Sequence, residues 1–269
     1  MVACHGGLRV GPAMTASKSM RADLLLVERG LAATRSQAQR LIVAGVRWRR
    51  ADDAALPWQS IARNGDDLPA QAQLELLDIA QARYVSRGGL KLDGALSAAG
   101  VDVTGMACLD VGQSTGGFTD CLLQRGAVRV VGVDVGHGQL HPRLRSDPRV
   151  AAIEKLNARE LDARHVGRNF DLVTGDLSFI SLTLVLPALV PLLAPGGTLL
   201  MLAKPQFELQ PGQIGKHGVV RDPALYRVVE RRLREACAGL GLEVAGWYDS
   251  PITGGDGNRE FFTHATKKN

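Results

Sequence analysis

Apolar and polar positions alternate differently in the front and rear parts of the chain. From residue 86 onward, apolar runs of strand length are separated by stretches with helical periodicity. The expected strands are 107–111, 128–133, 170–174, 198–202, 242–250 and 261–265, and the expected helices are 117–125, 182–193 and 223–240. This alternation predicts an α/β domain in which helices cover both faces of a mostly parallel sheet.

Residues 20–78 have a different pattern, with an apolar stretch at 24–27, a turn at Gly30 and a helical pattern at 36–43 that ends at Gly45. It predicts a small α+β domain. We expect residues 1–19 to form a flexible extension, or to precede a real start at Met20, because they contain no continuous apolar core. Residues 79–85 are the expected linker, and 86–269 the second domain.

The longest uncharged stretch covers residues 177–203 and is long enough to cross a membrane. Prolines and glycines interrupt it at Pro187, Pro191, Pro195, Gly196 and Gly197. This pattern favours a buried helix, a tight turn and a buried strand over a membrane span.

Composition narrows the class of protein. The chain has 269 residues, 45% of them apolar, and a formal net charge of +5, which suits a polyanionic partner without requiring one. The cysteines, Cys4, Cys108, Cys121 and Cys237, show neither a CxxC pair nor a Cys/His pair. We therefore expect no metal site and no disulfide framework, and a reducing cytoplasm as the location.

The front segment concentrates arginines in one acid-free stretch and carboxylates in the next. The arginines are Arg29, Arg35, Arg40, Arg47, Arg49 and Arg50, and the carboxylates begin at Asp52. Such segregation predicts a cationic face able to bind phosphates, although a solvated helix face gives the same pattern. Trp48 could stack on a base or pack in the core.

Within this segment, MRADLLLVERGLAATRSQAQRLIVAG resembles the S-four-like RNA-binding module. The resemblance implies that Arg21 joins the six arginines in contacting RNA. The family continues with a short strand and an Asn-Gly turn, whereas this chain has Val46-Arg-Trp-Arg-Arg-Ala-Asp-Asp. The geometry of the following hairpin is therefore open.

A glycine-rich turn follows the first strand of the rear domain, in Cys108-Leu-Asp-Val-Gly-Gln-Ser-Thr-Gly-Gly-Phe-Thr-Asp120. This pattern is DxGxxxGG rather than GxGxxG, and no phosphate loop of the GxxxxGK[ST] type occurs. A carboxylate at Asp110 repels phosphate but suits the cationic cofactor S-adenosylmethionine. An NAD-binding fold and a turn without a ligand remain alternatives.

A second acidic position supports the same cofactor. Asp134 ends the next strand, 22 residues after Gly112, where a carboxylate can accept hydrogen bonds from ribose hydroxyls. Asn157 could bind the adenine or serve as an ordinary loop residue. The expected cofactor residues are Asp110, Gly112, Gln113, Ser114, Gly116, Gly117, Phe118, Asp134 and Asn157.

Charged residues also follow two later strands, in Thr174-Gly-Asp-Leu-Ser-Phe179 and Leu202-Ala-Lys-Pro-Gln-Phe-Glu208. Neither the [DN]-P-P-[FY] signature of base-amine methyltransferases nor a nearby cysteine nucleophile is present. Asp176 and Lys204 instead indicate proton transfer at a hydroxyl.

As a set, SRGGLKL, DVGQSTGGFTD, GDLSFISL, KPQFE and GNREFF resemble the TlyA family, whose catalytic half is FtsJ-like. The resemblance implies a Rossmann-like class I methyltransferase domain with a seven-stranded sheet. It also implies methylation of ribosomal RNA at a cytidine ribose 2′-hydroxyl. The implied catalytic tetrad is Lys91, Asp176, Lys204 and Glu260. Gln113 departs from the small residue usual at its position.

A ribose hydroxyl must be oriented toward the methyl group and lose its proton during attack. A lysine can accept that proton when burial and a neighbouring cation lower its pKa. We expect Lys204 to be this base and Lys91 the neighbouring cation, with Asp176 and Glu260 holding the ammonium groups. Four unrelated surface charges remain an alternative.

Two other functions remain open from the sequence. One is a non-catalytic RNA-binding or ribosome assembly factor with the same fold, against which the four charged residues argue. The other is a membrane-active haemolysin, a label that the TlyA family often carries. No basic amphipathic helix of adequate length supports the haemolysin interpretation.

Overall fold

The computed structural model describes residues 19–53, 56–77 and 83–268, and the chain divides into two compact units at residues 82 and 83. Residues 1–18, most of the expected extension, lie outside the described residues, as do 79–82 of the expected linker. The linker also ends earlier than expected. Tyr84 and Val85 are buried in an apolar cluster of the second unit, because their side chains contribute to its core.

Among its described residues, the small unit has two helices and five short strands. They are β1 (Ser19–Arg21), α1 (Ala22–Glu28), α2 (Arg35–Gly45), β2 (Val46–Arg49), β3 (Gln59–Ser60), β4 (Asp67–Pro69) and β5 (Gln73–Leu76). Strand β1 pairs with β4, and β2 lies between β3 and β5 in an antiparallel sheet. Helix α2 begins where the Thr34 hydroxyl accepts a hydrogen bond from the Gln37 N–H. Leu25, Leu26 and Leu41 of the two helices form the centre of its core.

Strand β2 has one apolar and one polar face. Val46 and Trp48 pack toward the apolar core, together with Leu74 and Leu76 of β5. Arg47 and Arg49 therefore lie on the opposite face, because successive side chains alternate across a strand. Of the two roles considered for Trp48, the structure supports core packing.

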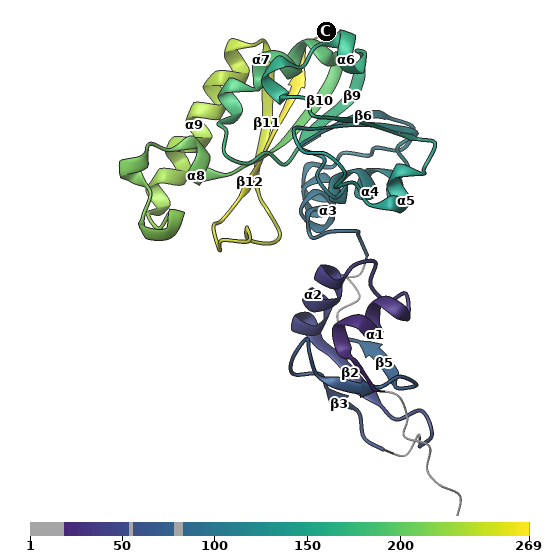
Figure 1. Ribbon diagram of the computed structural model, residues 1–269. Helices are drawn as coiled ribbons and strands as arrows, with labels where there is room; N and C mark the ends of the chain where they lie inside the picture. Colours follow the sequence, from purple (N-terminus) through teal and green to yellow (C-terminus); the bar gives the residue numbers. More distant parts are fainter. Residues whose placement is uncertain (1–18, 54–55, 78–82, 269) are drawn as a thin grey trace, which may run out of the picture. The chain divides into compact units, whose positions relative to one another are not determined.

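The second unit is built on a seven-stranded sheet (Figure 1). Its strands are β6 (Ala107–Val111), β7 (Arg129–Asp134), β8 (Val150–Glu154), β9 (Phe170–Gly175), β10 (Leu193–Ala203), β11 (Leu242–Asp249) and β12 (Phe261–Lys267). Their order is β11-β12-β10-β9-β6-β7-β8, and β12 is antiparallel to both of its neighbours. The predicted mostly parallel sheet is thus confirmed. The edge strand β8 was missing from the six strands expected.

Helices cover both faces of this sheet, as Figure 1 shows. The helices are α3 (Gly88–Ala99), α4 (Gly117–Gln124), α5 (Pro142–Arg145), α6 (Ala163–Val166), α7 (Leu186–Leu189), α8 (Pro205–Glu208) and α9 (Pro223–Gly239). Helices α3 and α4 pack into one apolar cluster, and α7 and α9 into another. Each face of the buried sheet thereby has its own core.

The segment expected as one helix at 182–193 is broken. It forms η3 (Leu182–Leu184), α7 and η4 (Val190–Leu192), because Pro187 and Pro191 have no N–H to continue a helix. Strand β10 begins earlier than expected, with an irregular register between Leu193 and Thr198. Within the described part of the chain, no helix is long and apolar enough to cross a membrane.

Candidate active site

The loop between β6 and α4 forms one wall of the site. Gly112 and Gly116 have φ angles of 85° and 93°, which favour glycine. A Cβ atom on Gly112 would lie 2.5 Å from the carbonyl oxygen of Asp176, and one on Gly116 would collide with Leu144. The absence of both side chains allows this loop to approach β9 and α5 closely.

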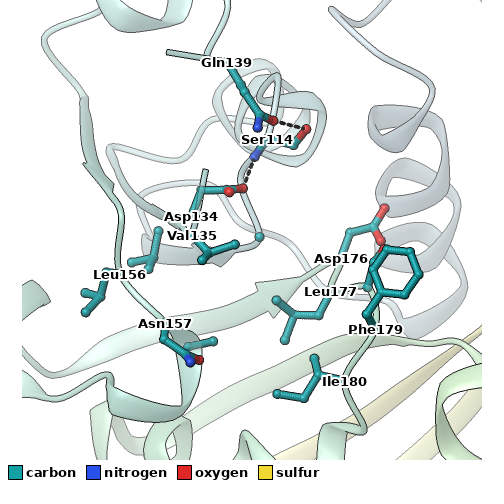
Figure 2. Close-up of a pocket in the computed structure, with 14 residues that line it drawn as sticks. Ser114, Asp134, Val135, Gln139, Leu156, Asn157, Asp176, Leu177, Phe179 and Ile180 are labelled. Atoms are coloured by element: carbon teal, nitrogen blue, oxygen red, sulfur yellow. Dashed lines mark hydrogen bonds between the residues drawn. The ribbon is translucent and has the colours of Figure 1, made fainter. Parts of the chain in front are cut away.

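Asp134, at the end of β7, is fixed by two backbone groups. Its carboxylate accepts hydrogen bonds from the N–H of Ser114 at 2.6 Å and of Gly136 at 2.7 Å. Figure 2 shows Ser114 between Asp134 and Gln139, whose side-chain oxygen lies 3.2 Å from the Ser114 hydroxyl. A carboxylate can accept about four hydrogen bonds, so two positions remain for a ligand.

A cavity of about 560 Å³ opens beside Asp134 (Figure 2). The apolar residues of its lining include Val133, Val135, Leu156, Leu177 and Ile180. Asn157 also lines it, and its side-chain oxygen accepts a hydrogen bond from the Arg159 N–H. The Asn157 amide nitrogen bonds to none of the described residues and faces no competing partner. This volume is in the range of small-molecule sites.

A second cavity of about 220 Å³ also adjoins the glycine loop. It shares Gly112, Ser114, Asp176 and Ser178 with the larger cavity, and its wall also includes Lys204. Gln113, Gly117 and Phe118 line this smaller cavity. A ligand that extends from the apolar cavity past the glycine loop would therefore end next to Lys204.

Asp110 and Gly116 line neither cavity, so the cofactor contact expected for them is not seen. Asp110 is 1% exposed and accepts a hydrogen bond of 2.7 Å from the Thr119 hydroxyl. Gln113 in turn donates one of 2.9 Å to that hydroxyl. Burial raises the pKa of Asp110 to about 7. Asp110 is thus buried beneath the surface of the loop and supports it through its hydrogen bond to Thr119, which also bonds to Gln113.

Four charged residues meet at one edge of the sheet. Asp176 and Lys204 follow the parallel strands β9 and β10, and Glu260 precedes the antiparallel β12, whose Phe261 lies opposite Ala203. The beginning of an antiparallel strand lies beside the ends of its parallel neighbours. Lys91, on helix α3, completes the group.

The charges alternate in sign along this group. The Lys204 ammonium lies 2.5 Å from one Asp176 oxygen, and the Lys91 ammonium 3.8 Å from the other. Lys91 also binds Glu260 at 2.5 Å. Lys91 and Glu260 are 6% and 4% exposed, whereas Asp176 lines both cavities. The structure thus brings the four predicted residues together, with the Asp176 carboxylate between the two lysines and Glu260 beyond Lys91. This order corrects the expected role of Lys91, because the charged group next to Lys204 is a carboxylate and not a cation.

Sequence reasoning missed two residues that hold this site together. Ser178 accepts a hydrogen bond of 2.9 Å from the Lys204 ammonium. Glu208 is buried, accepts hydrogen bonds from the Ser181 hydroxyl at 2.5 Å and the Leu182 N–H at 2.6 Å, and thereby ties α8 to the loop after β9. Both lie inside the motifs GDLSFISL and KPQFE, but a motif does not say which of its polar residues face each other.

Phe179 is a third residue without a predicted role. Its ring is 90% exposed, its φ angle is 63°, and it contacts the Phe207 ring at a centroid distance of 5.1 Å. Figure 2 shows Phe179 beside Asp176 at the rim of the cavity. A large exposed aromatic side chain in a strained backbone conformation points to a function.

The small unit distributes its predicted RNA-binding arginines over several roles. Arg21 and Arg35 both bind Asp23, which is fully buried. Hydrogen bonds from Arg21 and Arg35 hold the pKa of Asp23 well below its usual range. The remaining contacts are Arg29 with the Ala70 carbonyl, Arg47 with Glu75, Arg49 with Gln73 and Arg50 with Asp52, while Arg40 is half-buried on α2.

These contacts correct the expectation of one cationic face. Carboxylates that follow the arginines in the sequence lie close to them in the folded unit. Strand β5 pairs with β2 and brings Glu75 opposite Arg47. Arg21 and Arg35 stabilise the fold through Asp23. Segregation along the chain is therefore only partly retained in three dimensions.

Comparisons with known proteins agree with this geometry. The model of the FtsJ-like methyltransferase family matches residues 84–267. The 16S/23S rRNA (cytidine-2′-O)-methyltransferase TlyA of Mycobacterium tuberculosis is 45% identical over 250 residues, which cover 91% of this chain and 89% of that protein. A Bacillus subtilis protein with the provisional name rRNA methyltransferase YqxC is 45% identical over 249 residues, covering 92% and 86% of the two chains.

A solved structure from Streptococcus thermophilus, which carries a provisional hemolysin label, has a TM-score of 0.71 and 39% identity. The match covers 94% of this chain and 90% of that one. The seven-stranded sheet and the glycine loop between β6 and α4 are those of the S-adenosylmethionine-dependent methyltransferase fold. The chain belongs to the FtsJ-like methyltransferase family, as a TlyA-type member.

Proposed function

We propose that this enzyme transfers a methyl group from S-adenosylmethionine to the 2′-hydroxyl of a cytidine ribose in ribosomal RNA. The observation that carries the proposal is the alternating arrangement of Lys204, Asp176, Lys91 and Glu260 beside the cavity wall. The 45% identity between this chain and the TlyA protein of Mycobacterium tuberculosis supports the choice of substrate.

The two cavities fit the cofactor. Val135, Leu156 and Ile180 supply an apolar slot for the adenine, and Asp134 can accept hydrogen bonds from the ribose hydroxyls. Gly112 and Ser114 line both cavities, so the rest of the molecule can extend along the glycine loop toward Lys204. Bound S-adenosylmethionine supplies a methyl group on a positively charged sulfur, which a hydroxyl oxygen can attack.

Lys204 is the proposed base for the target hydroxyl. Its side chain is 11% exposed and is oriented by Asp176 and by the Ser178 hydroxyl. Lys91 holds the second oxygen of Asp176 and is itself held by Glu260, so the carboxylate position is determined from both sides. In this role Lys204 would first release one ammonium proton to solvent. Its neutral amine would then take the proton of the ribose hydroxyl as the oxygen bonds to the methyl carbon and the bond from that carbon to sulfur breaks.

Phe179 and the small unit would position the RNA. The exposed Phe179 ring lies at the rim of the cavity, where a base removed from its stack can lie against it. Arginines of the small unit, such as Arg29 and Arg49, supply contacts to phosphates. The cytoplasm is the proposed location, because ribosomal RNA is there and Cys108, Cys121 and Cys237 are free thiols.

The first test is methyl transfer to ribosomal subunits from cells that lack the gene, followed by nuclease digestion and mass spectrometry. We expect label on a ribose. Lys204→Ala should reduce the transfer rate by at least about 100-fold, the usual contribution of a general base, and leave S-adenosylmethionine binding within a few-fold. A normal rate in this variant, or label on a base, would overturn the proposal.

A further inference from the structure

The outward face of the β3-β2-β5 sheet carries a tryptophan that the core does not use. Trp58 directly precedes β3, whose Gln59 lies opposite Trp48, so Trp58 is next to Arg49. Trp48 packs against the apolar core of the small unit, but Trp58 belongs to none of the apolar clusters among the described residues. The Trp58 indole ring therefore has no part in filling the core.

Two guanidinium groups lie over the Trp58 ring. The Arg49 guanidinium lies 4.6 Å from the ring centroid, and that of Arg47 lies 5.2 Å away. These contacts fix the orientation of the indole through cation–π attraction. Glu75 binds Arg47 at 2.8 Å, and the Arg49 Nε donates a hydrogen bond of 2.7 Å to the Gln73 side chain.

A cavity of about 440 Å³ adjoins the ring. It is lined by Trp58, Arg29, Leu31 and the segment 71–74, which includes the amide side chains of Gln71 and Gln73. Arg29 donates a hydrogen bond of 2.6 Å to the Ala70 carbonyl, and none of the described carboxylates is within ion-pair distance of it. The cavity thus combines an aromatic wall, amide groups and a cation.

This combination matches the chemistry of a nucleotide. A nucleobase stacks on an indole ring, amide side chains can bond to base edges, and guanidinium groups bind the phosphates on either side. A cationic ligand is disfavoured by the surrounding arginines. The exposed sheet face with an aromatic platform resembles in its physics the surfaces on which single-stranded RNA is bound.

We propose that Trp58 stacks on a base of single-stranded RNA, with Arg29 and Arg49 contacting the adjacent phosphates. The site lies in the small unit and is separate from the methyl-transfer site; it rests on the proposed function only in taking RNA as the ligand. Its recognition is tolerant of sequence, because every base has a stacking face.

The test uses the full chain with Trp48→Phe and Trp247→Phe, which leaves Trp58 as the single remaining indole of the three in the sequence. The probe is an oligoadenylate of about ten nucleotides, a length within the range of known single-strand sites. The control strand is an abasic oligonucleotide with the same number of phosphates. We expect saturable quenching of the Trp58 emission by oligoadenylate and little quenching by the abasic strand.

Variants of the otherwise unmodified chain separate stacking from folding. Trp58→Leu keeps apolar bulk but removes the stacking face, so its affinity for oligoadenylate should fall about 5- to 100-fold. Trp58→Tyr should retain most of the affinity. Trp48→Phe is the matched control on the inner face of the same sheet and should bind as the unmodified chain does. Fluorescence anisotropy measures the affinities, and circular dichroism checks the fold.

Several results would overturn the proposal. They are an unquenched Trp58 emission while anisotropy shows bound RNA, unchanged affinity in a folded Trp58→Leu variant, absence of any RNA binding, or equal quenching by an acidic peptide of similar length. If Trp58→Leu does not fold, the Trp58→Tyr variant and the quenching measurement still decide. Binding is measured without S-adenosylmethionine, so loss of methyl transfer alone leaves this inference standing.

Discussion

The buried side chain of Gln113 influences how the glycine loop packs against the neighbouring strand β7. It is 5% exposed, and it lies across Gly132 of β7, where an added Cβ would collide with the Gln113 amide. The amide also bonds to Thr119, which bonds to Asp110. The departure from a small residue at position 113 is therefore accommodated by a glycine on the neighbouring strand and by a buried hydrogen-bond chain.

The pair predicts a specific double-mutant result. Gly132→Ala should lower the free energy of unfolding by about 1–3 kcal/mol, because the methyl group overpacks the space that Gln113 occupies. Gln113→Ala in the same chain should restore most of that loss by vacating the space. Urea denaturation of both single variants and the double variant measures the coupling. Additive effects of the two substitutions would contradict the proposed contact.

Asp110 predicts a pH dependence. Its native pKa is about 7, whereas an unfolded aspartate titrates near about 4, so the native state binds the proton more tightly. The stability contribution is present below about pH 4 and is lost as the pH rises through 7. Asp110→Asn removes this pH-dependent loss of stability, because asparagine does not ionise. Relative to the unmodified chain, the variant should gain about 3 kcal/mol between about pH 5 and about pH 8.

Denaturant titrations of both proteins at the two pH values check this difference. A stability gap between the unmodified chain and Asp110→Asn that does not change with pH would show that Asp110 is ionised at both values. The same titration with Asp102→Asn, which changes an exposed carboxylate bonded to Thr104, serves as a control for general charge effects.

At the scale of elements, Glu208 connects the segment that follows Asp176 with the segment that follows Lys204. It ends helix α8, which begins directly after Lys204, and it accepts hydrogen bonds from Ser181 and Leu182 in the segment after Asp176. Burial raises the pKa of Glu208, and the two hydrogen bonds oppose that effect. The distance between Lys204 and Asp176 therefore depends on a contact outside the tetrad.

Glu208→Ala should affect both stability and the chemical step. It leaves the buried Leu182 N–H without a partner, which costs about 1–3 kcal/mol of unfolding free energy. The kcat for methyl transfer should fall, because the Lys204 and Asp176 segments lose their connection, while the affinity for S-adenosylmethionine changes little. Glu208→Gln, which can still accept from the N–H, should recover part of kcat. Equal loss in both variants would argue against a positioning role.

At the scale of the whole molecule, some charged residues form ion pairs that stabilise the fold, and others lie at surface cavities where a ligand can reach them. In the small unit, Arg35 stabilises the fold through Asp23, whereas Arg29 lies at a surface cavity without an ionic partner among the described residues. In the second unit, the four charged residues lie at the sheet edge, where Asp176 and Lys204 line the smaller cavity. A net charge of +5 therefore says little about which cations contact RNA.

Two arginine substitutions separate the stabilisation of the fold from the binding of RNA. Arg35→Gln should lower the unfolding free energy by about 1–3 kcal/mol, because a buried carboxylate loses a charged partner. Arg29→Gln should leave stability nearly unchanged and lower the affinity for ribosomal RNA. It should also reduce the slope of log K against log salt by about 1 if Arg29 contacts a phosphate. Thermal unfolding and binding at several salt concentrations test both, and the reverse pattern would refute the assignment.

Much of the second unit was predictable because its signals are local. The run 107–111 matched β6, and the residues after each parallel strand had to meet at one edge, which brought Asp176 and Lys204 together. Strand β8 was missed because Val150–Glu154 is an edge strand with two exposed alanines and little apolar periodicity. The prediction of one helix at 182–193 was wrong, because Pro187 and Pro191 interrupt the backbone hydrogen bonds that a continuous helix requires.

The sequence by itself determined the α/β class, the small preceding domain, the glycine loop and the four charged residues of the tetrad, because strand periodicity, turn residues and motifs are local properties. Only the tertiary structure decided which partners these residues have. It placed Asp110 in a buried bond to Thr119, Glu75 beside Arg47, Glu208 in contact with the segment after Asp176, and Trp58 beside Arg49. Those outcomes depend on strand pairing and burial, which join residues far apart in the chain.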